Sequence, residues 1–287
     1  MYEEFYRLRH RPFSTLPDPS FMYWSEAHTM GITMLRYGLM SRAPITVVTG
    51  EIGAGKTTLI RQLLREAGED VRLGLVSNMQ PGRGDLLQWV LMALDERPGD
   101  DGYVTLFRRF QDIVVDTYAR GRRVVLIFDE AQNLSVDLLE ELRMLSNMNS
   151  EGDELLQLVL VGQPQLRDLI ERPELTQFRQ RVTADFHLEP LSAEEVEAYI
   201  HHRMELAGAA WRVFLPHTCK LVHEACRGVP RIVNSLCDLC LVYGFATEQR
   251  VIDETLLREF LAGAHQRGLY SQFKPLDKTP TLVKGTG

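Results

Sequence analysis

The stretch "TVVTGEIGAGKTTLIRQLL" (Thr46–Leu64) joins an apolar run to a helix-forming segment through a loop with three glycines and a lysine. The loop, Gly50–Thr57, matches the pattern G-x-x-x-x-G-K-[ST] directly after an expected strand and at the start of an expected helix. Glycine reaches backbone conformations that other residues avoid, so the main-chain N–H groups can turn toward phosphate oxygens. The sequence therefore predicts a nucleotide-binding loop.

Each polar residue of this loop has an expected role. Lys56 can reach the β- and γ-phosphates, Thr57 can offer its hydroxyl to Mg²⁺, and the following helix directs its positive end at the phosphates. Thr58 is expected to support the helix. We expect this loop to bind a nucleotide together with Mg²⁺. The expected nucleotide contacts are Gly50, Glu51, Ile52, Gly53, Ala54, Gly55, Lys56, Thr57 and Thr58.

Short valine-rich apolar runs alternate with segments long enough for helices between Ile45 and about His187. Continuous apolarity, rather than alternation with polar residues, is typical of strands buried on both faces. The pattern predicts an α/β fold, a parallel sheet covered by helices in an αβα sandwich. The expected strands are "ITVVT", "VRLGLVS", "RVVLIFD", "LLQLVLVG" and "VTADFHL".

After "LEPLS" the strand pattern stops, and a helix capped by Ser192, with Glu195 three positions on, is expected to end at Gly208. Further helices are expected over residues 216–226, 230–247 and 253–264. This stretch predicts a small all-helical second domain. The expected division is an N-terminal arm (1–40), a nucleotide-binding core (41–190), a helical lid (191–265) and a flexible tail (266–287).

Composition limits the functional classes. The 287 residues carry a formal net charge of −7, so no overall positive field attracts nucleic acid or anionic lipid. No run approaches the roughly 20 apolar residues of a membrane span, and we expect a soluble, cytoplasmic chain. The C-x-x-C of Cys237 and Cys240 could indicate zinc, but its apolar helical context and the lack of suitably spaced histidines favour core packing.

Two further strand ends carry polar side chains. In "RRVVLIFDEAQNL", Asp129 and Glu130 follow a buried strand, at the edge where ligands bind in open α/β sheets. Asp129 would hold Mg²⁺ through water, and Glu130 would act as general base; the alternative is a solvated turn. Gln163 ends the run "LQLVLVG". If its strand lies beside that of Asp129, its amide could orient water, and otherwise it caps the next helix.

Three arginines are candidates for contacts with the γ-phosphate. Arg179 and Arg181 precede the last expected strand, and one of them could reach the nucleotide of a neighbouring subunit. The sequence does not choose between them. Arg231 starts a helix of the second domain and could couple the lid angle to the nucleotide state.

Together these motifs resemble those of AAA+ ATPases, with Walker A at Gly50–Thr57 and Walker B at "VVLIFDE". The longer motifs "VTGEIGAGKTTLIRQLL", "LIFDEAQNLS", "LEELRMLSNM", "VLVGQPQLRDLI" and "GVPRIVNSLCDLCLV" are similar to the general secretion pathway protein A family, closest to the branch in exosortase and exopolysaccharide clusters. The resemblance implies that Gln163 is sensor 1, Arg179 or Arg181 the finger and Arg231 sensor 2. It places the N-terminal Phe13, Pro17 and Pro19 beside the adenine.

The resemblance implies an oligomeric ATPase, as a ring or filament, that serves as motor or switch and has ATP and Mg²⁺ as its cofactors. We expect it on the cytoplasmic side of an envelope export or polysaccharide assembly system, peripheral to the inner membrane through partners. Since the chain ends soon after the lid, we do not expect the membrane span and peptidoglycan-binding domain of the family's secretion member.

Two alternatives remain open. One is a DNA-associated ATPase like those that select transposition targets, although the acidic total disfavours nucleic acid as a partner. The other is a nucleotide-gated adaptor with little turnover. The arginines that motivate the first alternative lie in "RRFQDIVVDTYARGRR" and are Arg108, Arg109, Arg120, Arg122 and Arg123.

Overall fold

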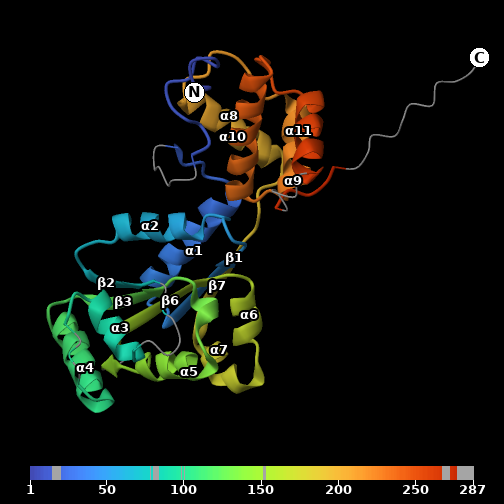
Figure 1. Ribbon diagram of the computed structural model, residues 1–287. Coiled ribbons are helices and arrows are strands. Elements are labelled where there is room, and N and C mark those ends of the chain that lie inside the picture. Colours follow the sequence, from blue (N-terminus) through green and yellow to red (C-terminus); the bar gives the residue numbers. More distant parts are fainter. Residues whose placement is uncertain are drawn as a thin grey trace, which may run out of the picture. The chain divides into compact units, whose positions relative to one another are not determined.

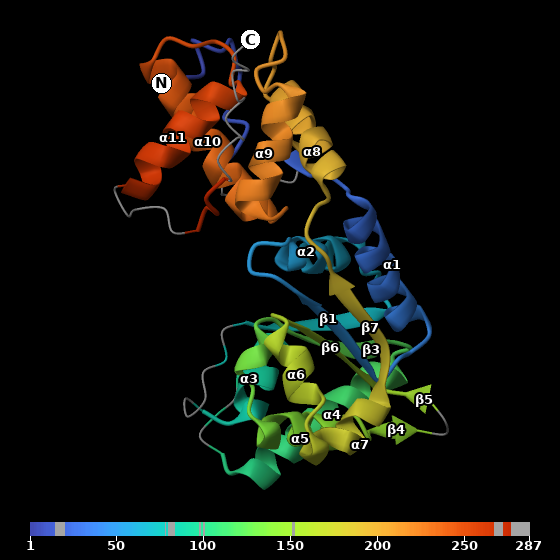
Figure 2. The ribbon, with the colours of Figure 1, turned by 90° about the vertical axis from the view of Figure 1, so that its right-hand side faces the viewer.

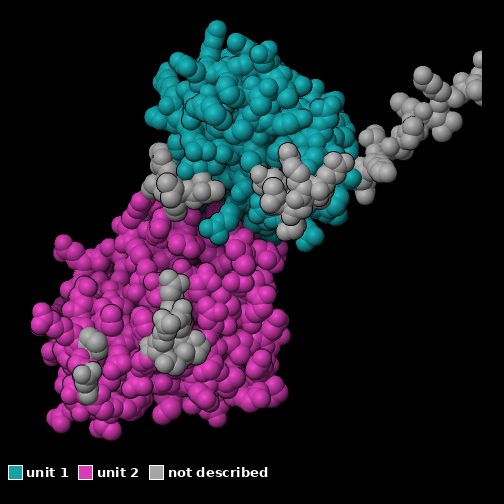
Figure 3. Space-filling model, viewed as in Figure 1, with its two compact units in different colours: residues 1–25, 190–287 teal, residues 26–189 magenta. Residues whose placement is uncertain are grey.

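The computed structural model describes residues 1–14, 21–77, 79, 84–97, 99, 101–150, 153–266 and 272–276. The chain forms two compact units (Figure 3): unit 2 is Glu26–Glu189, and unit 1 combines Met1–Ser25 with Pro190–Gly287. The expected arm of residues 1–40 is therefore not one element. Residues 1–25 belong to the helical unit, whereas the next residues form the first helix of the sheet unit.

Unit 2 is built on a five-stranded sheet in which every pairing is parallel and the order is β2-β3-β6-β1-β7. All five strands coincide with apolar runs of the sequence, so the predicted fold class is confirmed. Their bounds are β1 Ile45–Gly50, β2 Val71–Val76, β3 Arg123–Phe128, β6 Leu156–Gly162 and β7 Val182–Leu188.

Helices cover both faces of this sheet (Figures 1 and 2). One apolar cluster joins α1 and α2 to strand residues such as Val125 and Ile127. The other cluster joins the helices α3, α4, α5, α6 and α7 to the strand residues that point to the opposite face, such as Val124 and Leu126. Because successive side chains point to opposite faces and both faces are covered, the three central strands β1, β3 and β6 are buried along almost their whole length. The helices are α1 Glu26–Met40, α2 Lys56–Glu66, α3 Leu86–Ala93, α4 Tyr103–Ala119, α5 Val136–Leu145, α6 Gln165–Ile170 and α7 Thr176–Arg181.

The strand register brings three chain segments to one edge of the sheet. Phe128 at the end of β3 pairs with Leu160, and Thr49 at the end of β1 pairs with Gly162 at the end of β6. The segments that follow these three strands therefore start side by side. Short elements complete unit 2: the 3₁₀ turns η2 (Ala131–Asn133) and η3 (Pro173–Leu175), and the hairpin strands β4 (Asn149–Ser150) and β5 (Asp153–Glu154).

Unit 1 contains the helices expected after Leu191. The predicted capping box is present, because the Ser192 hydroxyl accepts from Glu195 N and the Glu195 carboxylate accepts from Ser192 N. The helices are α8 Ala193–Leu206, α9 Pro216–Cys226, α10 Pro230–Ala246 and α11 Glu254–Gln266. Within the described residues, no helix has both the length and the apolar character needed to cross a bilayer.

The N-terminal segment completes the core of unit 1. Tyr2, Tyr6 and Phe13 are buried there, and Phe13 packs its ring edge against Phe214 at a centroid distance of 5.7 Å. Arg203 of α8, also buried, donates from Nε to the Pro12 carbonyl over 2.6 Å. Residues 1–14 are thus part of this fold and not an external arm.

The cysteines and the C-terminal segment also serve packing. All four thiols, Cys219, Cys226, Cys237 and Cys240, are free and buried in the core of unit 1, and burial raises the pKa of each. In the described part of the chain, no group of three or more histidine, cysteine or acidic side chains could hold a metal. Phe273 is buried in the same core, so the described part of the expected tail is anchored; residues 267–271 and 277–287 of that tail lie outside the described residues.

Candidate active site

The loop between β1 and α2 has the strained backbone that its glycines predict. Gly53 and Gly55 have φ angles of 83° and 110°, in the region that side-chain-bearing residues avoid. Gly50 serves differently, because a Cβ there would lie 2.8 Å from the Leu188 carbonyl oxygen of β7. Two glycines therefore shape the loop, and the third allows its close approach to the neighbouring strand.

This loop offers a group of main-chain donors at the start of α2. The N–H of Ala54 bonds Glu51 O, and the N–H of Thr58 bonds Gly55 O. The N–H groups of Gly53, Gly55, Lys56 and Thr57 make no backbone hydrogen bond within the described residues. Donors grouped at a helix N-terminus are suited to phosphate oxygens.

The Lys56 side chain lies under this loop and is only 6% exposed. Its ammonium donates to the Gly50 carbonyl over 2.7 Å and to the Glu51 carbonyl over 2.9 Å. Burial lowers the pKa of Lys56, while the carboxylates of Glu130, Asp129 and Glu51 counteract this by favouring the charged form. A cation is thus held beside the donors of the loop, next to two carboxylates from the end of β3.

Thr57 and Asp129 bring oxygen ligands together from two elements. Thr57 Oγ1 donates to Asp129 Oδ2 over 3.5 Å, across 72 positions of sequence. Burial is the main cause that raises the pKa of Asp129, and the nearby Glu130 charge raises it further; the Glu130 N–H, Lys56 and Thr57 act in the opposite direction. Hydroxyl and carboxylate oxygens are the donors that Mg²⁺ prefers. The residues present therefore fit a magnesium ion bound partly by phosphates and water.

Glu130 has an unusual backbone for a residue with a side chain, with φ 56° and ψ 37°. This left-handed conformation costs roughly 1–2 kcal/mol for a residue other than glycine. Its N–H donates to Asp129 Oδ1 over 3.0 Å. Strained residues that persist are concentrated at functional sites, which supports a role for this carboxylate.

Gln163 reaches Glu130, as expected if β6 lies beside β3. Its Nε2 lies 3.3 Å from Glu130 Oε2 and donates to it. No role was expected for Gln132 from the sequence, although it stands in the quoted stretch "RRVVLIFDEAQNL". Its Nε2 donates to the same Glu130 oxygen over 2.6 Å. Two amides from different elements therefore hold one carboxylate oxygen.

His28 is a second residue that the sequence reasoning missed. It lies in the first turn of α1 and its Nε2 donates to the Ala54 carbonyl over 3.0 Å. The ring fits closely against the loop, because a Cβ on Gly55 would lie 2.4 Å from His28 Nε2. No local sequence pattern predicts the hydrogen bond between His28 and Ala54, since 26 positions separate these two residues.

The three arginine candidates differ in their surroundings. Arg181 Nη1 donates to the Ser146 carbonyl over 2.8 Å and lies 3.1 Å from its hydroxyl, so this side chain holds the end of α5. The Arg179 side chain is exposed and makes no hydrogen bond or ion pair within the part of the chain that the structure describes. Arg231 is exposed in the first turn of α10, in unit 1.

Of the N-terminal residues expected beside the adenine, the structure describes Phe13. Phe13 is 1% exposed in the core of unit 1, where it serves packing. Pro17 and Pro19 lie outside the described residues.

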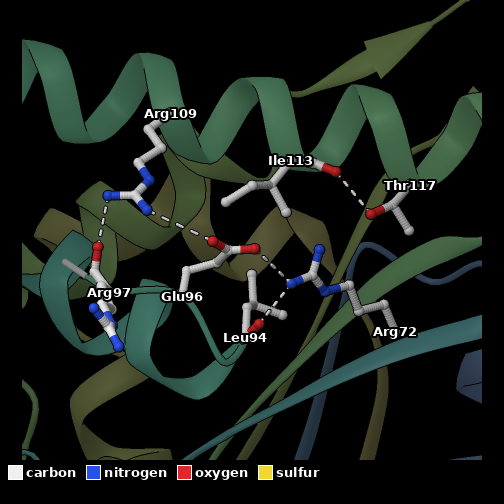
Figure 4. Close-up of polar contacts among 7 residues, drawn as sticks. All are labelled: Arg72, Leu94, Glu96, Arg97, Arg109, Ile113 and Thr117. Atoms are coloured by element: carbon white, nitrogen blue, oxygen red, sulfur yellow. Dashed lines mark hydrogen bonds and ion pairs between the residues drawn. The ribbon is translucent and has the colours of Figure 1, made fainter.

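Most arginines of the basic stretch around α4 are engaged within unit 2. Glu96 pairs with Arg72 at 3.1 Å and with Arg109 at 3.6 Å (Figure 4). Arg122 donates to the Val71 carbonyl over 3.3 Å, and Arg123 lies 3.9 Å from Asp70. The two ion pairs of Arg109 and Arg123 offset positive charge that the stretch could offer to a nucleic acid, and the Arg122 hydrogen bond holds its side chain against the main chain. Arg108 and Arg120 are exposed.

Sequence comparison places this site in a known domain. Residues 39–170 match the family model described as an AAA domain. The chain is 34% identical over 294 aligned positions to General secretion pathway protein A of Aeromonas hydrophila. The alignment covers 100% of this chain and 53% of that protein, so the chain spans about half the length of this relative.

Solved structures share the fold at low sequence identity. Cdc6p of Pyrobaculum aerophilum matches with a TM-score of 0.66 and 16% identity, over 88% of this chain and 70% of that one. The ORC2 protein of Aeropyrum pernix, solved as ADPNP-ADP complexes, matches with a TM-score of 0.60 and 18% identity, over 91% and 75% of the two chains. The chain therefore carries an AAA domain over residues 39–170 and is similar over its whole length to General secretion pathway protein A.

Proposed function

We propose that the chain binds ATP with Mg²⁺ and hydrolyses it, as an oligomeric switch or motor that serves secretion or exopolysaccharide export. The proposed hydrolysis is supported by one observation. The phosphate-binding loop, the Thr57 and Asp129 oxygens that suit Mg²⁺, and the oriented Glu130 carboxylate lie at one edge of the sheet. These parts follow β1 and β3, and β6, which lies between those two strands, brings Gln163 to the same edge.

The loop would hold the triphosphate through its main-chain N–H groups and Lys56. Thr57 and Asp129 would hold Mg²⁺, which neutralises charge on the β- and γ-phosphates when bound. Lys56 adds a fixed positive charge that is poorly screened because the side chain is buried. Charge stabilisation and positioning supply most of the rate in phosphoryl transfer, and these residues provide both.

Glu130 would act on the attacking water. The water oxygen forms a bond to the γ-phosphorus while the bond between that phosphorus and the β–γ bridging oxygen breaks. One water proton passes to Glu130, and the products are ADP and inorganic phosphate. Gln163 would assist from β6, since its amide already lies beside the carboxylate.

For the contact between subunits, the structure favours Arg179 over Arg181. A residue that acts on a neighbour's nucleotide must be free to leave its own surface, and Arg179 is exposed. Arg181 is tied to Ser146. We propose Arg179 as the finger in a homo-oligomer, and Arg231 of the helical unit as the sensor of the γ-phosphate.

The cellular role is proposed from the relative's name. A protein similar over its whole length to General secretion pathway protein A is proposed to act in the cytoplasm, beside the inner membrane, through partners of an export system. A nucleic acid is not the favoured partner, because Arg109, Arg122 and Arg123 are engaged internally.

Phosphate release from purified protein with ATP and Mg²⁺ tests the hydrolysis. The variant Glu130→Gln is expected to bind ATP with unchanged affinity and to lower kcat by at least about 100-fold, because the proton acceptor is lost. Lys56→Ala should abolish binding. Asp137→Asn, which removes an exposed carboxylate in the first turn of α5, is the matched control and should hydrolyse at the wild-type rate.

Unchanged turnover in Glu130→Gln would remove this residue from the mechanism. ATP-dependent assembly without measurable turnover in the wild-type protein would instead support the adaptor alternative. Assembly is measured by the molar mass with and without ATP, and Arg179→Ala should then still assemble but hydrolyse slowly.

A further inference from the structure

We propose that Gln132 is a positioning residue that orients the carboxylate of Glu130 and couples it to the strand end that carries Gln163. The inference rests on the proposed function, because it assigns a further residue to the same hydrolysis site.

Both ends of the Gln132 amide are used. Its Nε2 donates to Glu130 Oε2 over 2.6 Å, and its Oε1 accepts from the main-chain N–H of Gln163 over 2.9 Å. One side chain thus bridges the segment after β3 and the end of β6, 31 positions away. A glutamate here would place a second anion beside Glu130, and a leucine would make neither bond. Asparagine is one methylene shorter and could not span the same gap.

This bridge fixes which oxygen of Glu130 is available. Oε2 accepts from Gln132 and, at 3.3 Å, from Gln163 Nε2. Oε1 accepts no hydrogen bond within the residues that the structure describes. A carboxylate held at one oxygen by two amides cannot rotate freely, so the other oxygen keeps one direction toward water. A general base must point at the proton that it accepts, and this orientation is required in addition to a suitable pKa.

The neighbouring backbone leaves room for this amide. A Cβ on Gly162, the last residue of β6, would lie 2.9 Å from Gln132 Oε1. The turn η2 is held by its own main chain, since Asn133 N bonds Glu130 O and Leu134 N bonds Ala131 O, at 3.0 and 3.1 Å. The Gln132 side chain is therefore not needed to form the turn, and a purely local structural role does not account for its two contacts.

The experiment measures kcat at saturating ATP and the Kd for mant-ATP with Mg²⁺, on the whole chain. Gln132→Leu and Gln132→Asn should each lower kcat by about 10- to 100-fold, as expected when a catalytic group loses its orientation. The Kd for mant-ATP should change less than about twofold, since no phosphate ligand is altered. Asn133→Ala is the matched control. It removes an exposed amide from the same turn and should leave both values unchanged.

A double variant separates positioning from structure. If Gln132 acts through Glu130, adding Gln132→Leu to Glu130→Gln should cause no loss beyond that of Glu130→Gln alone. An equal loss in both backgrounds, or a matching loss in mant-ATP affinity, would show a structural role and overturn the inference. Wild-type kcat in both Gln132 variants would overturn it too, while Glu130→Gln still tests the proposed function. A wild-type protein that does not hydrolyse ATP would overturn both.

Discussion

Gly55→Ala tests whether the loop geometry controls nucleotide binding. The φ angle of 110° lies in the left-handed region, which costs a residue with a Cβ about 1–2 kcal/mol. The new Cβ would also lie 2.4 Å from His28 Nε2, so the imidazole must move away from the Ala54 carbonyl. Losing that hydrogen bond costs about 1 kcal/mol. The two effects add up to about 2–3 kcal/mol.

This free energy is divided between two measurable quantities. If the loop relaxes when no nucleotide is bound, the cost falls on binding and raises the Kd for mant-ATP. If the whole cost falls on binding, the Kd rises by about 30- to 150-fold. The remainder lowers the free energy of unfolding, measured by urea denaturation of the nucleotide-free protein. The sum of the two losses should be about 2–3 kcal/mol, whatever the division.

Gly121→Ala is the matched control, because Gly121 also has a positive φ of 72° but no atom within 4 Å of a built Cβ. It should lower stability by about 1 kcal/mol and leave mant-ATP binding unchanged. If Gly55→Ala loses less than about 0.5 kcal/mol in total, both the strain and the His28 contact are wrong as explanations for this glycine.

Three further predictions concern residues outside the phosphate loop. His28→Ala should weaken mant-ATP binding by about fivefold, through loss of a hydrogen bond of about 1 kcal/mol, and wild-type affinity would exclude His28 as a support of the loop. Arg203→Met should lower the free energy of unfolding of the chain by about 1–3 kcal/mol in urea, because the Pro12 carbonyl loses its partner inside the core of unit 1; an unchanged midpoint would contradict this. Burial raises the pKa of Cys219 to about 12, so this thiol, with the three other buried cysteines, should not react with a thiol reagent at pH 8 until urea unfolds the protein. Rapid reaction of any one thiol in the native protein would disprove that packing.

The arrangement of the site depends on strand order more than on any one motif. Asp129 and Gln163 follow strands that are adjacent, whereas β6 also separates β3 from β1. The end of β6 therefore lies between the loop and the carboxylates. This position explains how Gln163 can contact Glu130 from an element far away in sequence.

The strands of unit 2 and the helices of unit 1 could be predicted from the sequence, because consecutive residues carry the pattern of each element. The valine-rich runs indicate strands without any knowledge of the strands that pair with them. The Ser192–Glu195 capping box and the prolines at the first positions of α9 and α10 mark the N-termini of helices. The phosphate loop was readable for the same reason. Its glycines, lysine and threonine act within eight consecutive residues, Gly50–Thr57.

The sequence by itself determined the class of fold, the loop that would hold phosphate and the carboxylates after β3, since each depends on neighbouring residues and on the periodicity of apolar side chains. Only the tertiary structure decided that residues 1–14 belong to the core of the helical unit, that His28 supports the loop and that Gln132 holds Glu130. It also showed that Arg181 is tied to Ser146 while Arg179 is exposed. These are contacts between segments far apart in the chain, and their geometry follows from strand order and packing, which no local pattern encodes.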